Sequence, residues 1–351
     1  MIIKDIIDIM ENLAPPCLAM PDDKIGLQIG NANNKVSKIV VTLDITKDSV
    51  DFAVKNKADL IISHHPYIFN PITKISTPTL LEKILKHNIS IYAAHTNLDS
   101  CIGGVNDVLA EIIGLSDTKI FEPTHMEKLY KLVVFVPKDH TEKVRASICN
   151  AGAGNIGNYD NCTFTTAGSG TFRALKNANP FIGKKGVIEH IDEDRIETII
   201  SEFSIKEVLS SMLTSHPYEE VAYDIYPLEN PGRIFGLGRY GILNKPTSLK
   251  NLANNIKKTL NCPNIQVFGN PNKVIKTAVV WSGRGRGKIN SIKNCGADVF
   301  VVGEIMYEDI LLAKELGVSV IIAGHFETED IIIKPLADYL TKKTNLLTLI
   351  K

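Results

Sequence analysis

Three short motifs of the chain combine imidazole and carboxylate side chains in patterns that suit metal binding. Imidazole and carboxylate ligands without thiolates favour zinc, iron(II), manganese or nickel. The set exceeds the needs of one tetrahedral ion, so we predict two divalent ions about 3.5 Å apart, bridged by a carboxylate and water. A site for one metal and a site without metal remain alternatives. The motifs are "SHHP", "HTNLD" and "GHFETE", and their candidate ligands are His64, His65, His95, Asp99, His325 and Glu329.

The spacing within two of these motifs indicates a helical turn. In each, the carboxylate follows the histidine by four residues, which places both side chains on one face of a helix. Either member of a pair could bind the metal while the other lies behind the ligands and does not contact the ion. Metal-bound histidines usually donate their second ring N–H to a carboxylate or carbonyl. We predict that Asp44 and Glu304 accept such hydrogen bonds.

The segments around these motifs alternate between strand and helix. We expect helices near 46–56, 78–87, 286–294 and 307–316, each between two apolar runs. This pattern predicts an α/β fold with two βαβαβ half-sheets that form one metal-binding core. Polar residues follow the strands, at the sheet end where α/β proteins bind ligands. We therefore expect all the candidate ligands at one edge of one sheet. The predicted strands lie in "KIVVTLD", "ADLIISHH", "ISIYAAHTNLD", "KTAVVWSGRGRG", "DVFVVGE" and "VSVIIAGHFETE".

The middle of the chain breaks this alternation. Residues 128–231 have a βαββαβ pattern, which is typical of a small α+β, ferredoxin-like domain. Because the α/β pattern resumes afterwards, we predict a domain inserted into a discontinuous core of residues 1–127 and 232–351. The glycine-rich stretches "GAGNIGNY" and "GSG" do not join a strand to a helix, so they indicate turns rather than a nucleotide fingerprint.

Composition excludes several classes of protein. The 351 residues include 39 Lys+Arg and 39 Asp+Glu, so no basic excess indicates nucleic acid binding. The N-terminal segment "MIIKDIIDIMENLA" is an amphipathic helix pattern rather than a signal peptide, and no apolar run approaches the roughly 20 residues of a membrane helix. The six cysteines form no CxxC pair, which argues against a disulfide framework or a thiolate zinc site. We expect a cytoplasmic protein.

Longer motifs carry a resemblance to a known family. The chain resembles the Nif-three-like family of dinuclear-metal proteins, also catalogued as homologues of type-two GTP cyclohydrolase 1. The resemblance implies a dinuclear metal centre, a toroidal homohexamer and an inserted domain similar to the PII and CutA proteins. It also implies the ligands His64, His65, Asp99, His325 and Glu329, with Glu329 as the bridge and His95 close by. The motifs, in chain order, are "DDKIGLQIG", "SHHP", "HTNLD" with "GGVND", "NYDNCTFTTAGSGTFRALKNANPFIG", "HPYEEVAYDIYPL" and "GHFETE".

The chain departs from the family pattern near the expected substrate pocket. Residues 21–24 read "PDDK" where relatives commonly have a Trp-Asp-Asn run. Glu308 stands where relatives often carry a histidine, and Arg284 and Arg286 occupy a turn that is usually rich in Gly and Ser. These changes leave the predicted metal ligands intact but alter the pocket that would receive a substrate.

Two classes of function fit this set of residues. The first is a metal-dependent hydrolase: Asp99 and Glu329 would leave about two positive charges on the ions, which favours a small anionic phosphoester or nucleotide. His95 would be catalytic, holding water or donating a proton. Arg284 and Arg286 would contact phosphate or lie in a solvated loop. Cyclohydrolase activity is a variant that rests on the family resemblance.

The second class is a non-enzymatic metal-handling or regulatory protein whose inserted domain senses a ligand. The motif "HPYEE", residues 216–220, is either part of such a ligand site or a turn that packs Tyr218.

Overall fold

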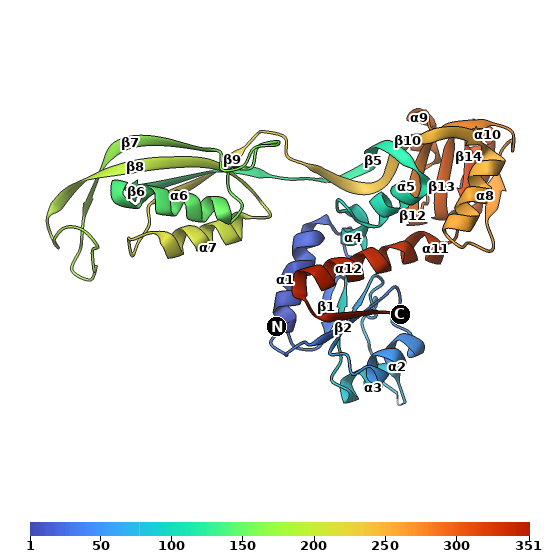
Figure 1. Cartoon of the computed structure of the whole chain (residues 1–351), viewed down its shortest axis with the longest axis horizontal. Helices are drawn as coiled ribbons and strands as arrows, with labels where there is room; N and C mark the ends of the chain where they lie inside the picture. Colours follow the sequence, from blue (N-terminus) through green and yellow to red (C-terminus); the bar gives the residue numbers. More distant parts are fainter. Residues whose placement is uncertain (77) are drawn as a thin grey trace. The chain divides into compact units, whose positions relative to one another are not determined.

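The computed structural model describes residues 1–76 and 78–351. Their strands form three β-sheets, with helices packed against the sheets (Figure 1). The chain forms two compact units. The first unit joins Met1–His125 with Ile234–Lys351, and the second is Met126–Arg233. The protein is therefore a mixed α/β protein.

The first sheet of the first unit is built on three short, buried parallel strands. Helices α2 (Lys47–Lys55) and α3 (Leu80–Lys86) cover one face, where Val50 and Ile84 pack on the apolar strand residues. Helices α1 (Ile3–Leu13) and α12 (Ile333–Thr344) lie on the other face (Figure 1). The strands, in sheet order, are β1 (Gly26–Ile29), β4 (Ser90–Ala93), β3 (Leu60–Ser63), β2 (Lys38–Thr42) and β15 (Leu347–Ile350), of which β1 alone in this sheet is antiparallel to its neighbour.

The second sheet of this unit repeats the arrangement with a longer central strand. Alternate residues of that strand serve the two faces: Ala278 and Val280 contact α5 (Val105–Ile113) and α8 (Leu249–Thr259). Val279 and Trp281 contact the opposite pair of helices, α9 (Ile289–Asn294) and α10 (Tyr307–Leu316). The strands, in sheet order, are β11 (Gln266–Phe268), β14 (Ser319–Ile322), β13 (Val299–Glu304), β12 (Val274–Arg284), β10 (Ile234–Ser248) and β5 (Leu115–Met126).

The expectation that the candidate ligands share one edge of one sheet is wrong. Within the described residues, no strand pairing joins the sheet of β2, β3 and β4 to the sheet of β12, β13 and β14. Each sheet already has strands on both outer sides, with β15 beside β2 and β10 beside β12. These added strands use the backbone hydrogen-bonding groups through which the two halves could have paired. The candidate ligands therefore come from the strand ends of two sheets.

The second unit is a four-stranded antiparallel sheet with both helices on one face (Figure 1). All of its residues, 126–233, are described. Val144 and Ile148 from one helix and Val208 and Met212 from the other form its core with the central strands. Its elements, in chain order, are β6 (Leu129–Pro137), α6 (Thr141–Asn150), β7 (Thr163–Arg173), β8 (Ile188–Ser201), α7 (Ile205–Ser215) and β9 (Tyr223–Leu228).

The two ends of the second unit lie side by side. The Glu127 N–H donates to the Arg233 carbonyl at 2.8 Å, and the Arg233 guanidinium donates to the Glu127 carboxylate at 2.8 and 3.0 Å. A Cβ at Gly232 would lie 2.2 Å from the Glu127 carbonyl oxygen, so this close approach requires glycine. Although burial opposes the effect, the donors Arg233 and Ser201 lower the pKa of Glu127. The second unit is thus closed at its base.

Among the helices of residues 1–76 and 78–351, none is both long and apolar enough to cross a bilayer.

A buried guanidinium joins helix α5 to strand β10. Arg239 is 2% exposed, and its side chain donates to the Asp107 carboxylate and to the carbonyl oxygens of Gly236, Gly238 and Cys101. Four acceptors thus share one side chain. Asp107 and Cys101 also accept from the Gly103 and Gly104 N–H groups, but removing Arg239 would leave the Asp107 carboxylate without its counter-ion.

We expect Arg239→Met to lower the free energy of unfolding by about 3–5 kcal/mol, because it leaves the Asp107 carboxylate without its counter-ion and removes one donor from each of three carbonyls. Urea denaturation followed by circular dichroism measures this. The control is Lys334→Met, which breaks the exposed Lys334–Asp338 pair and should cost less than about 0.5 kcal/mol. Equal losses in the two variants would contradict the structural role given to Arg239.

Candidate metal centre

The two adjacent histidines after strand β3 both reach one cluster because the chain turns there. The His64 and His65 N–H groups still donate to the carbonyls of Thr42 and Leu43, at 3.2 and 3.0 Å. The Ser63 hydroxyl donates to the His65 carbonyl at 2.8 Å, which closes the turn. The two imidazole centroids are 5.0 Å apart. A regular strand would have sent these side chains to opposite faces.

The other candidate ligands lie on two short helices that follow strands β4 and β14. Helix α4 (Thr96–Ser100) begins directly after His95 and carries Asp99, and helix α11 (His325–Glu329) carries both members of its pair. The four-residue spacings thus correspond to single helical turns, as predicted.

These elements create two overlapping groups of potential ligands. In each group the ligand atoms lie within 4.8 Å of one another. His64, His65 and His95 form one group, and His65, His325 and Glu329 form the other. Asp99 is adjacent, with its Oδ1 3.8 Å from His64 Nε2. The six candidate residues therefore lie together, while their individual roles toward a metal stay predictions.

Every imidazole of the cluster is held through its Nδ1 atom. Since the partners are carbonyl or carboxylate oxygens, a proton on Nδ1 suits each contact, and Nε2 is the ring nitrogen left for other partners. Asp44 and Glu304, which the sequence suggested for this role, hold two of the rings. The pairs are His64 with the Ala94 carbonyl at 2.9 Å, His65 with Asp44 at 2.8 Å, His95 with Asp23 at 2.8 Å and His325 with Glu304 at 3.3 Å.

One buried nitrogen at the centre of the cluster lacks a hydrogen-bond partner. Within the described residues, His64 Nε2 makes no hydrogen bond. Glu329 Oε2 lies 3.0 Å from His65 Nε2 and 3.1 Å from His325 Nε2, and Glu329 Oε1 lies 4.0 Å from His64 Nε2. A buried polar atom without a partner costs about 1–3 kcal/mol, which a bound cation would offset. The donor set therefore fits a divalent metal ion.

The electrostatics of the cluster also fit a cation. Burial lowers the pKa of His64 to about 4, so this ring is neutral at pH 7, as a metal ligand must be. Burial opposes the change at His65, but the Glu329 and Asp44 carboxylates raise its pKa to about 9. Burial and the charge of Glu329 raise the pKa of Asp99. The cluster thus gathers carboxylates that attract protons or a cation.

Residues Ser282 and Gly283, at the end of strand β12, complete the site from the second sheet. The Ser282 hydroxyl donates to Asp99 Oδ1 at 3.1 Å, and the Gly283 N–H donates to the Thr328 hydroxyl at 3.1 Å. Gly283 has φ +59°, and a Cβ there would lie 2.2 Å from Glu329 Oε1 and 3.3 Å from His325 Nε2. Glycine is therefore required to leave room for the ligands.

Sequence reasoning missed three of these residues. Asp23 was noted only within the motif "DDKIGLQIG" and the departure "PDDK", and was given no role, yet it holds His95 and also accepts from the Thr96 N–H at 3.1 Å. Ser282 and Gly283 belong to the "SGRGRG" turn, in which the sequence analysis gave a role only to the arginines. Of those, Arg284 donates to Glu304 at 2.8 Å and so supports the carboxylate behind His325. The available signal was a Ser-Gly pair directly after an apolar strand.

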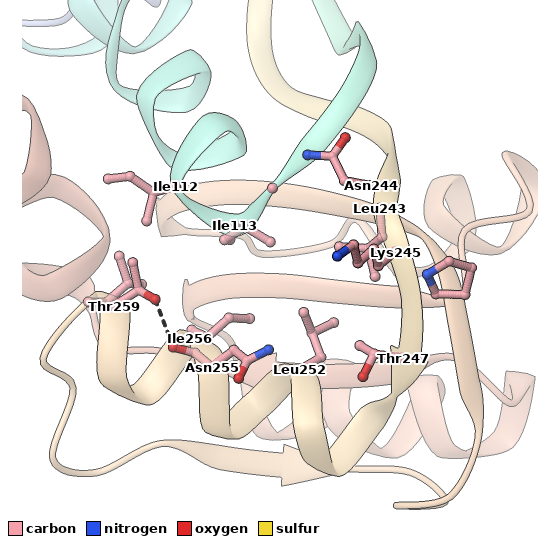
Figure 2. Close-up of a pocket in the computed structure, with 13 residues that line it drawn as sticks. Ile112, Ile113, Leu243, Asn244, Lys245, Thr247, Leu252, Asn255, Ile256 and Thr259 are labelled. Carbon is pink, nitrogen blue, oxygen red and sulfur yellow. Dashed lines mark hydrogen bonds between the residues drawn. The ribbon is translucent and has the colours of Figure 1, made fainter.

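A separate cavity of about 480 Å³ lies between the end of α5, strand β10 and helix α8 (Figure 2). Figure 2 shows Ile113, Leu243 and Ile256 among its walls. None of the residues that line it belongs to the cluster of histidines and carboxylates.

Comparison with known proteins gives the family of the chain. The family model described as Duf34/NIF3 (NGG1p interacting factor 3) matches residues 1–350. The chain belongs to this family. A relative from Bacillus subtilis named "GTP cyclohydrolase 1 type 2 homolog" is 44% identical over 327 residues, which is 92% of this chain and 88% of the relative. A relative of the same name from Halalkalibacterium halodurans is 43% identical over 324 residues, 91% of this chain and 87% of the relative.

A solved structure supports the same assignment. The crystal structure of a Bacillus cereus protein related to NIF3 is 41% identical and superposes with a TM-score of 0.88, covering 100% of this chain and 96% of that one. The resemblance to the Nif-three-like family noted in the sequence is thus confirmed.

We expect Gly283→Ala to reduce the metal bound after saturation with zinc, because the added methyl group would occupy the space of Glu329 Oε1. Elemental analysis of the dialysed protein measures this. Gly287→Ala is the matched control: Gly287 also has a positive φ, +72°, but nothing lies within 4 Å of its added Cβ. Equal metal content in both variants would exclude the proposed crowding.

Proposed function

We propose that the protein binds two divalent metal ions and uses them as a hydrolase that acts on a phosphoester or nucleotide-like substrate. The observation that carries the proposal is the pair of ligand groups that share His65. Every imidazole of these groups contacts a carbonyl or carboxylate oxygen through its Nδ1 atom. One compact group suits one ion, and two overlapping groups suit a pair of ions joined by shared ligands. In the first group we propose Asp99 as the ligand in place of His95, because Asp99 Oδ1 lies 3.8 Å from His64 Nε2. Zinc or iron is the favoured metal, with manganese or nickel as alternatives.

The proposed ligands are His64, His65, Asp99, His325 and Glu329, with Glu329 as the bridge. The position of Glu329 supports this role, because its two oxygens approach three different imidazoles at 3.0–4.0 Å. When bound, the ions would supply positive charge and lower the pKa of a coordinated water from about 15.7 to about 7.

His95 is the proposed catalytic residue. Its side chain is 21% exposed and so is accessible to a small molecule, while the more exposed His65 and His325 are assigned as ligands. Asp23 orients the ring. Burial raises the pKa of Asp23, but the donors His95 and Thr96 bring it well below its usual range. An ionised Asp23 keeps the Nδ1 proton of His95 in place, which leaves Nε2 to hold water or move a proton.

A cyclohydrolase acting on GTP is a narrower form of this proposal. It is supported by the name of the relatives, "GTP cyclohydrolase 1 type 2 homolog", and by the need of ring opening for activated water. The alternative class is a non-enzymatic metal-handling or regulatory protein, which would use the same ligands without turnover.

Substitutions separate these possibilities. We expect Asp99→Ala to lose metal and turnover together, since it removes a ligand. His95→Asn should keep both metals and lose about 10²- to 10⁴-fold in turnover, the usual contribution of a general acid or base. Elemental analysis and a panel of phosphoesters, nucleotides and GTP measure the two effects.

The control for that panel is His65→Ala, which should bind less metal and show only background turnover. If the fully metallated protein turns over none of these compounds above that background, the metal-handling alternative replaces the hydrolase. If His95→Asn loses metal instead, His95 is a ligand.

We further propose that residues 128–231 form an inserted PII/CutA-like domain and that the chain assembles into a toroidal homohexamer. The βαββαβ order of this segment and its antiparallel sheet support the first part. The hexamer is supported only by the family resemblance.

Replacing Met126–Arg233 by a short linker between the neighbouring ends should leave the metal content of the protein unchanged. A monomeric mass by light scattering at micromolar concentration would refute the hexamer.

A further inference from the structure

The second unit contains a cavity of its own, about 540 Å³ in volume, formed entirely by residues 135–222. It lies among β6, β7, β8, the loop that follows β7 and the turn that precedes β9. That turn carries the "HPYEE" motif, so the motif contributes walls to a cavity as well as packing Tyr218. This volume suits a small organic molecule.

Aromatic rings surround Tyr218 in this cavity. The centroids of Phe172 and Phe181 each lie 6.3 Å from that of Tyr218, and the three rings come from different segments of the unit. Phe181 remains 54% exposed although it is a large apolar side chain. Rings that line a cavity without packing closely against one another leave faces for a ligand, and such faces attract cations.

The charges that line the cavity are mainly negative. Glu193, Glu219 and Glu220 contribute three carboxylates, against the single cation of Arg173. A phosphate or carboxylate ligand would face this excess, whereas an ammonium group would be attracted by both the carboxylates and the rings. The charges that line the cavity therefore favour a cationic ligand over an anionic one.

The central carboxylate is held by specific contacts. The Tyr218 hydroxyl donates to Glu193 Oε1 at 2.9 Å. A Cβ at Gly170, on the neighbouring strand, would lie 2.1 Å from Glu193 Oε2, so the carboxylate occupies space that only glycine leaves free. At Gly168, two residues earlier, the nearest atom to an added Cβ is the Glu193 carbonyl oxygen at 3.9 Å.

His216, the first residue of the motif, holds the backbone of Tyr218 in place. His216 Nδ1 accepts from the Tyr218 N–H at 3.1 Å, so Nε2 carries the proton and donates to the Phe135 carbonyl at 3.0 Å. Glu219 accepts from the Asn179 N–H at 2.7 Å and so holds the loop that carries Phe181. The "HPYEE" motif therefore fixes the positions of Tyr218 and of the loop around Phe181, and does more than lead the chain into strand β9.

From these contacts we propose that this cavity binds an organic cation, an ammonium group attached to an apolar or aromatic body. The ammonium group would lie between Glu193 and the faces of Tyr218, Phe172 and Phe181, and the body would fill the apolar remainder near Leu175 and Ile182. The proposal does not depend on the metal centre, since every residue involved belongs to Met126–Arg233.

The test uses the full-length protein and three probes of similar shape: benzyltrimethylammonium, benzyl alcohol and phenyl phosphate. Isothermal titration calorimetry should show binding of the cation alone, with a Kd of about 1 mM or tighter. Glu193→Gln keeps an acceptor for Tyr218 but removes the charge, and should weaken binding about tenfold. Its matched control is Glu197→Gln on the same strand, since Glu197 does not line the cavity and should change Kd less than about twofold.

A second pair of variants tests the position of the carboxylate. Gly170→Ala should displace Glu193 and weaken binding as Glu193→Gln does, whereas Gly168→Ala should not. Circular dichroism of each variant checks that the unit is folded. The proposal is overturned if the wild-type protein binds none of the probes, if benzyl alcohol or phenyl phosphate binds as well as the cation, or if Glu193→Gln binds unchanged.

Discussion

The orientation of four imidazoles is the constraint on which the rest of the cluster depends. Each ring contacts a carbonyl or carboxylate oxygen through Nδ1, so Nε2 is the atom left for other partners. Glu329 Oε2 lies 3.0 and 3.1 Å from Nε2 of His65 and His325, and among the described residues the buried His64 Nε2 has no hydrogen-bond partner. The fold therefore gathers nitrogen and oxygen ligands in a partly buried site that positive charge between them stabilises.

The two sheets of the first unit act as the frame for this arrangement. Parallel strands end where their helices begin, and the short helices α4 and α11 start directly at the histidines. The buried Asn106 side chain joins the sheets at this point: it donates to the Asp99 carbonyl at 3.1 Å and accepts from the Ser282 N–H at 3.0 Å. One amide thus links the backbone at Asp99, which follows the first sheet, to strand β12 of the second.

The features that the sequence predicts are those set by local pattern. Short apolar runs locate the parallel strands, and the spacing of His325 and Glu329 locates a helical turn. The separation of the two sheets was not predictable in this way, because β15 and β10 compete for the same strand edges from distant parts of the chain. Asp23 was missed for a similar reason, since 72 residues separate it from His95 and no periodicity links them.

The closed base of the second unit has a consequence for the entropy of the whole chain. A long unfolded segment between β5 and β10 would cost the first unit loop-closure entropy, by about 0.6 kcal/mol for each doubling of its length. Because the Glu127 N–H and the Arg233 carbonyl are only 2.8 Å apart, folding of the second unit turns that long loop into a tight connection. Anything that stabilises the folded second unit therefore also favours folding of the first, without any contact to the metal ligands.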